Sequence, residues 1–220
     1  IYIQVNIQGF IHLLEQAVKN NVSQFVYASS SSVYGLNKSV PFSEKDTIET
    51  CNSPYACSKR CMEIFAKMYN QLYGLNIIGL RFFTVYGPRG RPDMAPYKFI
   101  RAIHNQTAFN KYGTGDSSRD YTYIDDIVKG VLSALENKKN IQCNVYNLGN
   151  SNPISLNTFI KLCEKVVQKK ALYHQIENQQ GDVPHTYANI SKAKEDLGYY
   201  PQTSLEEGLT KLFKWIQTIR

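Results

Sequence analysis

A tyrosine and a lysine four positions apart are the residues of this sequence best suited to act together in a chemical step. Tyr55 and Lys59 stand at the start of a segment with strong helical features, and residues four apart on a helix lie on one face, about one turn apart. An ammonium group beside a phenol favours the phenolate, which makes a tyrosine a usable general base. The spacing Tyr-x-x-x-Lys also arises by chance on amphipathic helices, so the pair alone is a weak motif.

A run of serines strengthens the case for a site. The run Ser29–Ser32 begins at the end of a short apolar segment, 24–29, that we expect to be a strand. Hydroxyl groups at the carboxyl end of a parallel strand face the crevice in which ligands bind. Ser30 is the preferred candidate for a substrate contact and Ser32 the second, whereas the competing interpretation of such a run is a turn or flexible loop.

The surrounding pattern predicts an α/β fold. Helices are expected at 9–20, at 54–73 with Ser53 as N-cap, Pro54 at the first position and Gly74 as the stop, and at 125–136 with Asp125 as cap. Each is followed by a short apolar strand, at 24–29, 76–83 and 144–148. Helices that alternate with apolar strands indicate a parallel sheet covered on both faces.

The last third of the chain predicts a smaller lobe. We expect a helix over 155–169, a strand over 171–176, a short helix near 191–197 and a final helix that opens with a capping box at 204–207. The Pro- and Gly-rich stretch 87–96 is the expected crossing between lobes. The pair Asp125 and Asp126 is interpreted as a cap and a partner of the helix dipole rather than as an acid/base dyad.

Composition narrows the classes of function. The chain is 43% apolar and carries five cysteines without a Cys-x-x-Cys pair, which favours a soluble protein of a reducing compartment, the cytoplasm. The longest apolar runs are far shorter than the roughly 20 residues of a membrane span. The net charge of +7 is spread over helices without a basic stripe, and the four histidines are scattered. We therefore expect no nucleic-acid partner, no membrane association and no metal site.

Four motifs in order carry a family resemblance. They are Ser29–Gly35 (SSSSVYG), Ser53–Lys59 (SPYACSK), Leu80–Pro88 (LRFFTVYGP) and Arg119–Asp126 (RDYTYIDD). Together they resemble the nucleotide-sugar epimerase and dehydratase branch of the extended short-chain dehydrogenases, and the resemblance runs along the whole chain. Gly90–Ala95 and Gly181–Val183 look most like the UDP-glucuronate 4-epimerases of that branch.

The resemblance implies an NAD-dependent enzyme and a role for each matched residue. It implies that Tyr55 is the general base, that Lys59 binds the nicotinamide ribose, and that Ser30 and Ser32 contact the sugar. Cofactor contacts are implied for Asn6 and Phe83, although Asn6 is equally well explained as a helix N-cap. Substrate contacts are implied for Thr84 at the sugar, Arg91 at a sugar carboxylate, Tyr112 near the uridine and Arg119 on the diphosphate. The competing interpretation is a surface ion pair for Arg119 and a solvated loop charge for Arg91.

The implied architecture is a partial Rossmann-type doubly wound sheet with a smaller substrate-binding lobe. Residues 1–90 and about 121–150 would form the NAD-binding part, and residues 91–120 and 151–220 the lobe. The helices at 9–20 and 54–73 would pair two subunits into a homodimer. The sequence contains no Gly-x-Gly-x-x-Gly turn after a strand, so we expect a fragment that begins within the fold.

The implied reaction is the 4-epimerisation of a UDP-sugar, UDP-glucuronate to UDP-galacturonate, through a 4-keto intermediate. Another UDP-hexose 4-epimerase or a nucleotide-sugar dehydratase are alternatives. Ser31 and Ser32 stand where dehydratases of the branch have an Asp-Glu pair, which argues against the dehydratase. A non-catalytic remnant is the alternative from another class, because the glycine-rich cofactor loop is absent.

Overall fold

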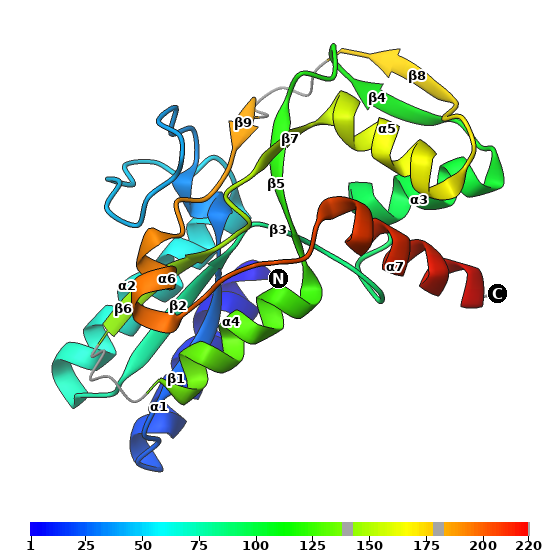
Figure 1. Cartoon of the computed structure of the whole chain (residues 1–220). Helices are drawn as coiled ribbons and strands as arrows, with labels where there is room; N and C mark the ends of the chain where they lie inside the picture. Colours follow the sequence, from blue (N-terminus) through cyan, green and yellow to red (C-terminus); the bar gives the residue numbers. More distant parts are fainter. Residues whose placement is uncertain (138–142, 178–182, 220) are drawn as a thin grey trace. The chain divides into compact units, whose positions relative to one another are not determined.

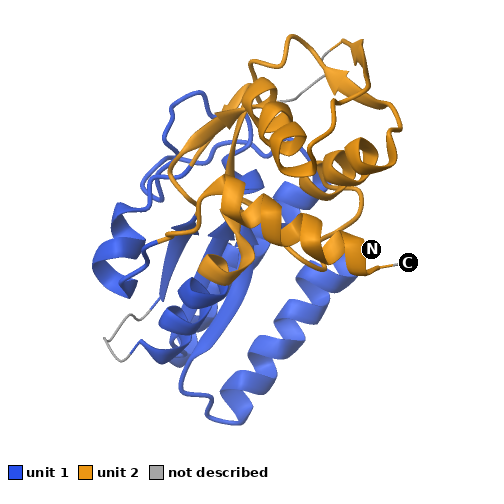
Figure 2. Cartoon of the chain, turned by 45° about the vertical axis from the view of Figure 1, so that its right-hand side comes forward, with its two compact units in different colours: residues 1–83, 128–148, 188–200 blue, residues 84–127, 149–187, 201–220 orange. Residues whose placement is uncertain are grey.

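The computed structural model describes residues 1–137, 143–177 and 183–219. The chain divides into two compact units (Figure 2). The first comprises Ile1–Phe83, Val128–Leu148 and Ala188–Tyr200, and the second comprises Thr84–Ile127, Gly149–Tyr187 and Pro201–Arg220. The first division falls at Phe83 rather than near residue 90, and the segment 188–200, which we expected in the smaller lobe, belongs to the first unit.

The first unit is built on a parallel sheet, in agreement with the expected α/β class. Strands β1 (Phe25–Ser30), β2 (Ile77–Phe82) and β6 (Cys143–Leu148) lie in the order β1-β2-β6 and pair in parallel (Figure 1). A π-helix (Ile3–Gly9) leads into α1 (Phe10–Lys19), and a 3-10 turn (Ser31–Tyr34) follows β1. The other helices are α2 (Pro54–Tyr73), α4 (Ile124–Glu136), whose last nine residues belong to this unit, and α6 (Ser191–Leu197).

Alternation along the strands decides which helix covers which face. Tyr27 of β1 packs in one cluster with Phe10 and Leu14 of α1 and Met62 and Ala66 of α2, so α1 and α2 share a face of the sheet. The opposite face receives α4, where Leu148 lies against Gly130 (Figure 1). Helices on both faces bury a parallel sheet, as the apolar strand sequences require.

Helix α2 begins and ends where the sequence predicts. The Ser53 hydroxyl accepts a hydrogen bond from the Ala56 N–H at 3.1 Å, and Gly74 takes a left-handed conformation with φ +69° as the helix ends. Helix α4 differs from expectation because it begins at Ile124, which leaves Asp125 inside the first turn rather than at the cap. Asp126 is buried and accepts hydrogen bonds from the backbone of Gln202 and Thr203.

The second unit contains short strands and three helices around its own core. Its elements are β3 (Thr84–Tyr86), α3 (Ala95–Asn105), β4 (Phe109–Tyr112), β5 (Ser118–Tyr123), β7 (Pro153–Ser155), α5 (Leu156–Val167), β8 (Tyr173–Ile176), β9 (His185–Thr186) and α7 (Leu205–Thr218). Strand β5 pairs with β3, β7 and β9, and β4 pairs with β8. Phe99, Phe159 and Leu209 bring α3, α5 and α7 into one apolar core.

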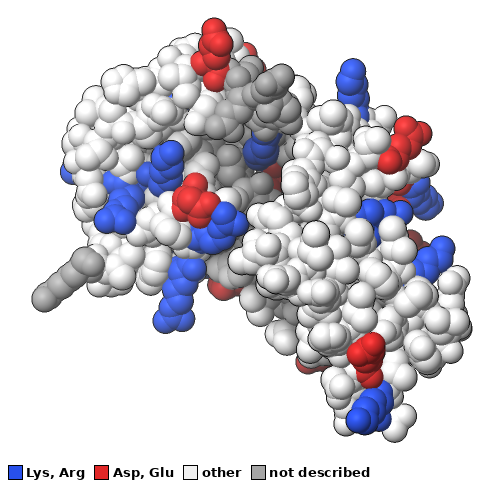
Figure 3. Space-filling view, turned by 180° about the vertical axis from the view of Figure 1, so that it is seen from behind, with Lys and Arg blue, Asp and Glu red and all other residues white. Residues whose placement is uncertain are grey.

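No helix in the described part of the chain is both long and apolar enough to cross a membrane. On the face shown in Figure 3, lysine and arginine side chains are scattered, and some of them lie beside aspartate or glutamate. Gly181 and Asp182, which contribute to the family resemblance, lie outside the described residues.

Candidate active site

Tyr55 and Lys59 are neighbours on α2. The Ser53 cap and Pro54 start the helix immediately before Tyr55, so both side chains belong to its first two turns. The Lys59 ammonium nitrogen lies 5.9 Å from the centroid of the Tyr55 ring. Both residues are half-buried. The arrangement allows a cation to act on a phenol that solvent and a ligand can both reach.

Lys59 also joins α2 to the first strand. Its Nζ donates a hydrogen bond of 2.9 Å to the carbonyl oxygen of Ala28, two residues before β1 ends. Burial lowers the pKa of Lys59 below its ordinary value. The ammonium has three N–H donors, so further hydrogen bonds to a ligand are compatible with this contact.

Ser30 and Ser32 lie together beyond the end of β1. Ser30 is the last residue of the strand, and its hydroxyl accepts a hydrogen bond from the Ser32 N–H and donates to the Ser32 hydroxyl, each at 3.2 Å. The serine run is therefore a capped 3-10 turn rather than a flexible loop. Ser29 points elsewhere, because successive strand residues face opposite sides, and its hydroxyl donates to Glu63 at 2.7 Å.

Asn6 contacts the helix that carries Tyr55. It lies within the π-helix, so the N-cap interpretation is wrong. Its amide nitrogen donates to the Ser58 hydroxyl at 2.9 Å, and that hydroxyl donates to the Tyr55 carbonyl oxygen at 2.8 Å. The ring of Tyr2 lies 5.6 Å from the ring of Tyr55. The N-terminal segment therefore supports the first turn of α2.

Phe83 follows β2 and closes the first unit. Its N–H donates to the Leu148 carbonyl oxygen at 3.1 Å, and the residue is 7% exposed. The rings of Tyr34 and Phe42 each lie 6.4 Å from it. Phe83 is thus fixed in an aromatic cluster beside the carboxyl ends of β1 and β6.

The remaining four candidates belong to the second unit. Thr84 begins β3, and Arg119 lies on the neighbouring strand β5, where its Nη1 donates to the carbonyl oxygens of Ser118 and Pro184. Tyr112 ends β4 opposite Ile176. Arg91 forms an exposed ion pair with Asp93, with Nη2 and Oδ2 2.5 Å apart. Within this unit Thr84 and Arg119 lie on paired strands, whereas Tyr112 lies on β4 and Arg91 in the loop before α3.

A buried ionic cluster beside the site escaped the sequence interpretation. Glu63 lies one turn after Lys59 on α2, and its carboxylate accepts hydrogen bonds from Arg81, Arg60 and Ser29. A signal was present, since Arg81 is the one charged residue in the otherwise apolar strand β2 (IIGLRF). A charge in such a strand requires a buried partner. Among the described residues, no group of three His, Cys, Asp or Glu side chains could hold a metal ion.

Comparison with known proteins gives consistent matches. A family model described as the NAD dependent epimerase/dehydratase family matches residues 1–149. UDP-glucuronate 4-epimerase 2 of Arabidopsis thaliana is 45% identical over 230 residues, which cover 97% of this chain and 53% of the plant protein. The chain therefore spans about half the length of this relative.

Solved structures match the whole fold. The UDP-glucuronic acid 4-epimerase of Bacillus cereus, in complex with UDP-glucuronic acid and NAD, is 38% identical with a TM-score of 0.91, over 96% of this chain and 67% of the bacterial one. The UDP-N-acetylglucosamine 4-epimerase of Methanobrevibacter ruminantium, in complex with UDP-N-acetylmuramic acid, is 29% identical with a TM-score of 0.92, over 98% of this chain and 70% of the other.

Proposed function

Because the chain belongs to the NAD dependent epimerase/dehydratase family, we propose that it carries the catalytic residues of an NAD-dependent UDP-sugar 4-epimerase. UDP-glucuronate is the proposed substrate and UDP-galacturonate the product. The observation that carries the proposal is the pairing of Tyr55 with Lys59 beside the carboxyl end of β1, where Ser30 and Ser32 lie. Ligands of parallel α/β sheets bind at this end of the strands.

The chain's residues act on the proton of the sugar C4 hydroxyl. Tyr55 removes this proton as general base, and Ser30 hydrogen-bonds the same oxygen while it becomes a carbonyl. The Lys59 ammonium stabilises the phenolate form of Tyr55, which is the form that accepts the proton. After the 4-keto sugar has turned its other face, Tyr55 returns the proton, and C4 has the inverted configuration.

NAD supplies the acceptor and donor of the hydride that leaves and returns to C4. The residues present fit the nicotinamide half of this cofactor. Lys59 has N–H donors left for the ribose hydroxyls, and Asn6 and Phe83 lie on segments next to Tyr55 and the strand ends. The sequence holds no glycine-rich turn, so we assign the pyrophosphate half to no residue of this chain.

Substrate contacts are proposed for five further residues. Ser32 assists Ser30 at the sugar, and Thr84 contacts the sugar next to the cofactor. Tyr112 lies near the uridine and Arg119 binds the diphosphate, for which a guanidinium fork is suited. Arg91 binds the carboxylate that distinguishes a uronate from a neutral hexose. The similarity to a UDP-N-acetylglucosamine 4-epimerase supports a rival proposal, an epimerase of neutral or N-acetylated hexoses.

The variant Tyr55→Phe tests the proposal directly. Removal of the general base should lower kcat for UDP-galacturonate formation by about 10²- to 10⁴-fold, measured in the longest form of the protein that its reading frame encodes. Tyr73→Phe, at the exposed end of the same helix, is the matched control and should retain activity. Undiminished turnover by Tyr55→Phe would end the assignment.

We also propose a cytoplasmic homodimer formed through α1 and α2. All five cysteines are unpaired, which supports a reducing compartment. Ile64, Met68 and Leu72 form an exposed apolar stripe on α2, and Leu13 is exposed on the adjacent α1. Apolar residues at helical spacing on an outer face are typical of helix-to-helix interfaces.

A further inference from the structure

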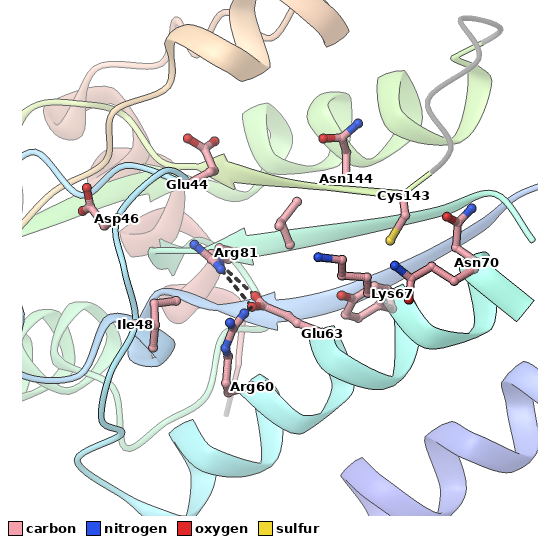
Figure 4. Close-up of a pocket in the computed structure, with 13 residues that line it drawn as sticks. Glu44, Asp46, Ile48, Arg60, Glu63, Lys67, Asn70, Arg81, Cys143 and Asn144 are labelled. Atoms are coloured by element: carbon pink, nitrogen blue, oxygen red, sulfur yellow. Dashed lines mark hydrogen bonds and ion pairs between the residues drawn. The ribbon is translucent and has the colours of Figure 1, made fainter.

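One buried carboxylate, that of Glu63, joins three elements of the first unit. It lies on α2 with Arg60 and binds Arg81 of β2 and Ser29 of β1. Arg81 donates to Glu63 through Nε and Nη2, each at 2.8 Å, Arg60 donates through Nη1 at 2.8 Å, and the Ser29 hydroxyl donates at 2.7 Å. Figure 4 shows Glu63 facing both arginines from α2. The side chains of Glu63 and Arg81 are only 4% and 2% exposed. The cluster therefore joins helix and sheet around a buried Glu63–Arg81 pair, in which the Nη1 atom of Arg81 has no hydrogen-bond partner among the described residues.

Stability by itself is a weak reason for such a cluster. Burial alone would raise the pKa of the Glu63 carboxyl, but the hydrogen bonds and charge of Arg81, with help from Ser29 and Arg60, hold that pKa below its usual value. The carboxylate is thus charged in the interior. A buried ion pair commonly stabilises a fold no better than apolar side chains of similar volume. What four directed hydrogen bonds add over apolar packing is a defined geometry.

The joined positions all lie next to the proposed catalytic residues. Glu63 lies four and eight positions after Lys59 and Tyr55 on α2, hence on the same side of the helix. Ser29 immediately precedes Ser30. Arg81 is the direct partner of Ser29 in the β1–β2 ladder and lies two residues before Phe83. The carboxylate therefore holds the helix that carries the base against the strand that carries the substrate hydroxyl.

The cluster also supports the turn that contains Ser32. The Arg81 guanidinium carbon lies 4.8 Å from the centroid of the Tyr34 ring. Tyr34 ends the 3-10 turn Ser31–Tyr34, and its hydroxyl donates to Asn147 at 2.7 Å. Ser30 and Ser32 thus lie between Ser29 and Tyr34 in the sequence. Ser29 contacts Glu63, and Tyr34 contacts Arg81.

Lys59 cannot provide the same constraint. Its contact with the Ala28 carbonyl oxygen also joins α2 to β1, but the proposed function requires this ammonium to bind the cofactor ribose as well. A flexible lysine side chain that shares its ammonium with a ligand fixes the helix less rigidly than a carboxylate held by several hydrogen bonds. Glu63 has no such task, because its oxygens are occupied by Arg81, Arg60 and Ser29.

We propose that Glu63, locked by Arg81 and Ser29, is a positioning residue that sets Tyr55 and Lys59 against Ser30. The inference rests on the proposed epimerase function. Its effect is on the geometry of the proton transfer, for which a misplacement of about 1 Å can cost on the order of 100-fold in rate.

The decisive variant replaces the pair by apolar residues, Glu63→Met with Arg81→Met. This change removes the directed hydrogen bonds without leaving a buried charge unpaired, so the midpoint temperature of unfolding should stay near that of the unmodified protein. We expect kcat to fall on the order of 100-fold while KM for the UDP-sugar changes little. Ser29→Ala, which leaves the ion pair intact, should lower kcat by about 10-fold.

Lys67→Ala is the matched control, because Lys67 is exposed one turn beyond Glu63. It should retain the activity of the unmodified protein. Normal kcat in the double variant with an unchanged unfolding midpoint would show that the cluster is merely structural and would overturn the proposal.

A crystal structure of the double variant separates this inference from the proposed function. The expected result is a shift of α2 along β1 that moves Tyr55 and Lys59 relative to Ser30. An α2 that superimposes on the original overturns the positioning role, whether or not the protein epimerises a sugar. An inactive unmodified protein would instead contradict the proposed function alone.

Discussion

At the scale of single residues, the unusual group is the charged carboxylate inside the first unit. Glu63 has a lowered pKa in the folded protein, because the donors around it outweigh the cost of its burial. The unfolded chain, with an ordinary glutamate, therefore binds this proton at a higher pH than the folded protein does. The resulting stability is present above the ordinary glutamate pKa of about 4.3 and is lost as the pH falls through the lower, folded value.

Acid unfolding should reveal this contribution. We expect the free energy of unfolding of the unmodified protein to fall more steeply below about pH 4.3 than that of the variant Glu63→Met with Arg81→Met, which lacks the carboxyl group. Urea unfolding at a series of pH values measures both slopes. Glu136→Gln, at an exposed position of α4, should keep the steep slope, and equal slopes for all three proteins would contradict the role given to Glu63.

At the scale of elements, α2 serves three purposes along two faces. The face toward the sheet packs Met62 and Ala66 into the core and also carries Tyr55, Lys59 and Glu63. The stripe of Ile64, Met68 and Leu72 is exposed. A second exposed apolar stripe, formed by Val128, Leu132 and Leu135, lies on α4, which covers the opposite face of the sheet.

Substitutions in the two stripes should affect the proposed dimer differently. Ile64→Glu should convert the proposed homodimer into a monomer, because the substitution buries an unpaired charge in the interface. Leu132→Glu on α4 should leave the dimer intact. Sedimentation equilibrium or light scattering measures the mass of each variant, and dissociation by Leu132→Glu rather than by Ile64→Glu would assign the interface to α4 instead.

At the scale of the whole molecule, the chain passes repeatedly from one unit to the other, and the proposed roles divide along the same boundary. Tyr55, Lys59 and Ser30 belong to the first unit, and Arg91, Tyr112 and Arg119 belong to the second. The proton transfer is thereby proposed to depend on the first unit, and the recognition of the sugar carboxylate, the uridine and the diphosphate on the second. Such a division lets substrate contacts vary without disturbing the base.

Arg91→Ala tests this division. If the guanidinium holds a sugar carboxylate, its loss should lower kcat/KM for UDP-glucuronate by about 10- to 100-fold, the worth of a hydrogen bond to a charged group. Activity on UDP-glucose should change far less. Arg89→Ala, at an exposed position two residues earlier, is the control, and an equal loss on both sugars would favour the neutral-hexose proposal.

The sequence by itself determined the features whose causes are local. The bounds of α2 follow from Ser53, Pro54 and Gly74, and the approach of Lys59 to Tyr55 follows from helical spacing. The α/β class followed from the alternation of helices and apolar strands, and it is confirmed. Each of these features depends on residues within a turn or two of one another, so a linear pattern records it.

Tertiary structure decided whatever depends on residues far apart in the chain. Strands β3, β4, β5, β7 and β9 are two to six residues long and pair with partners distant in sequence, so they leave little periodicity to read. Helix α3 (Ala95–Asn105) begins within the stretch 87–96 that was interpreted as a simple crossing. Glu63 meets Ser29 across 34 positions and Arg81 across 18. Only the folded sheet brings these groups together, because a hydrogen bond forms where the donor and the acceptor meet in space.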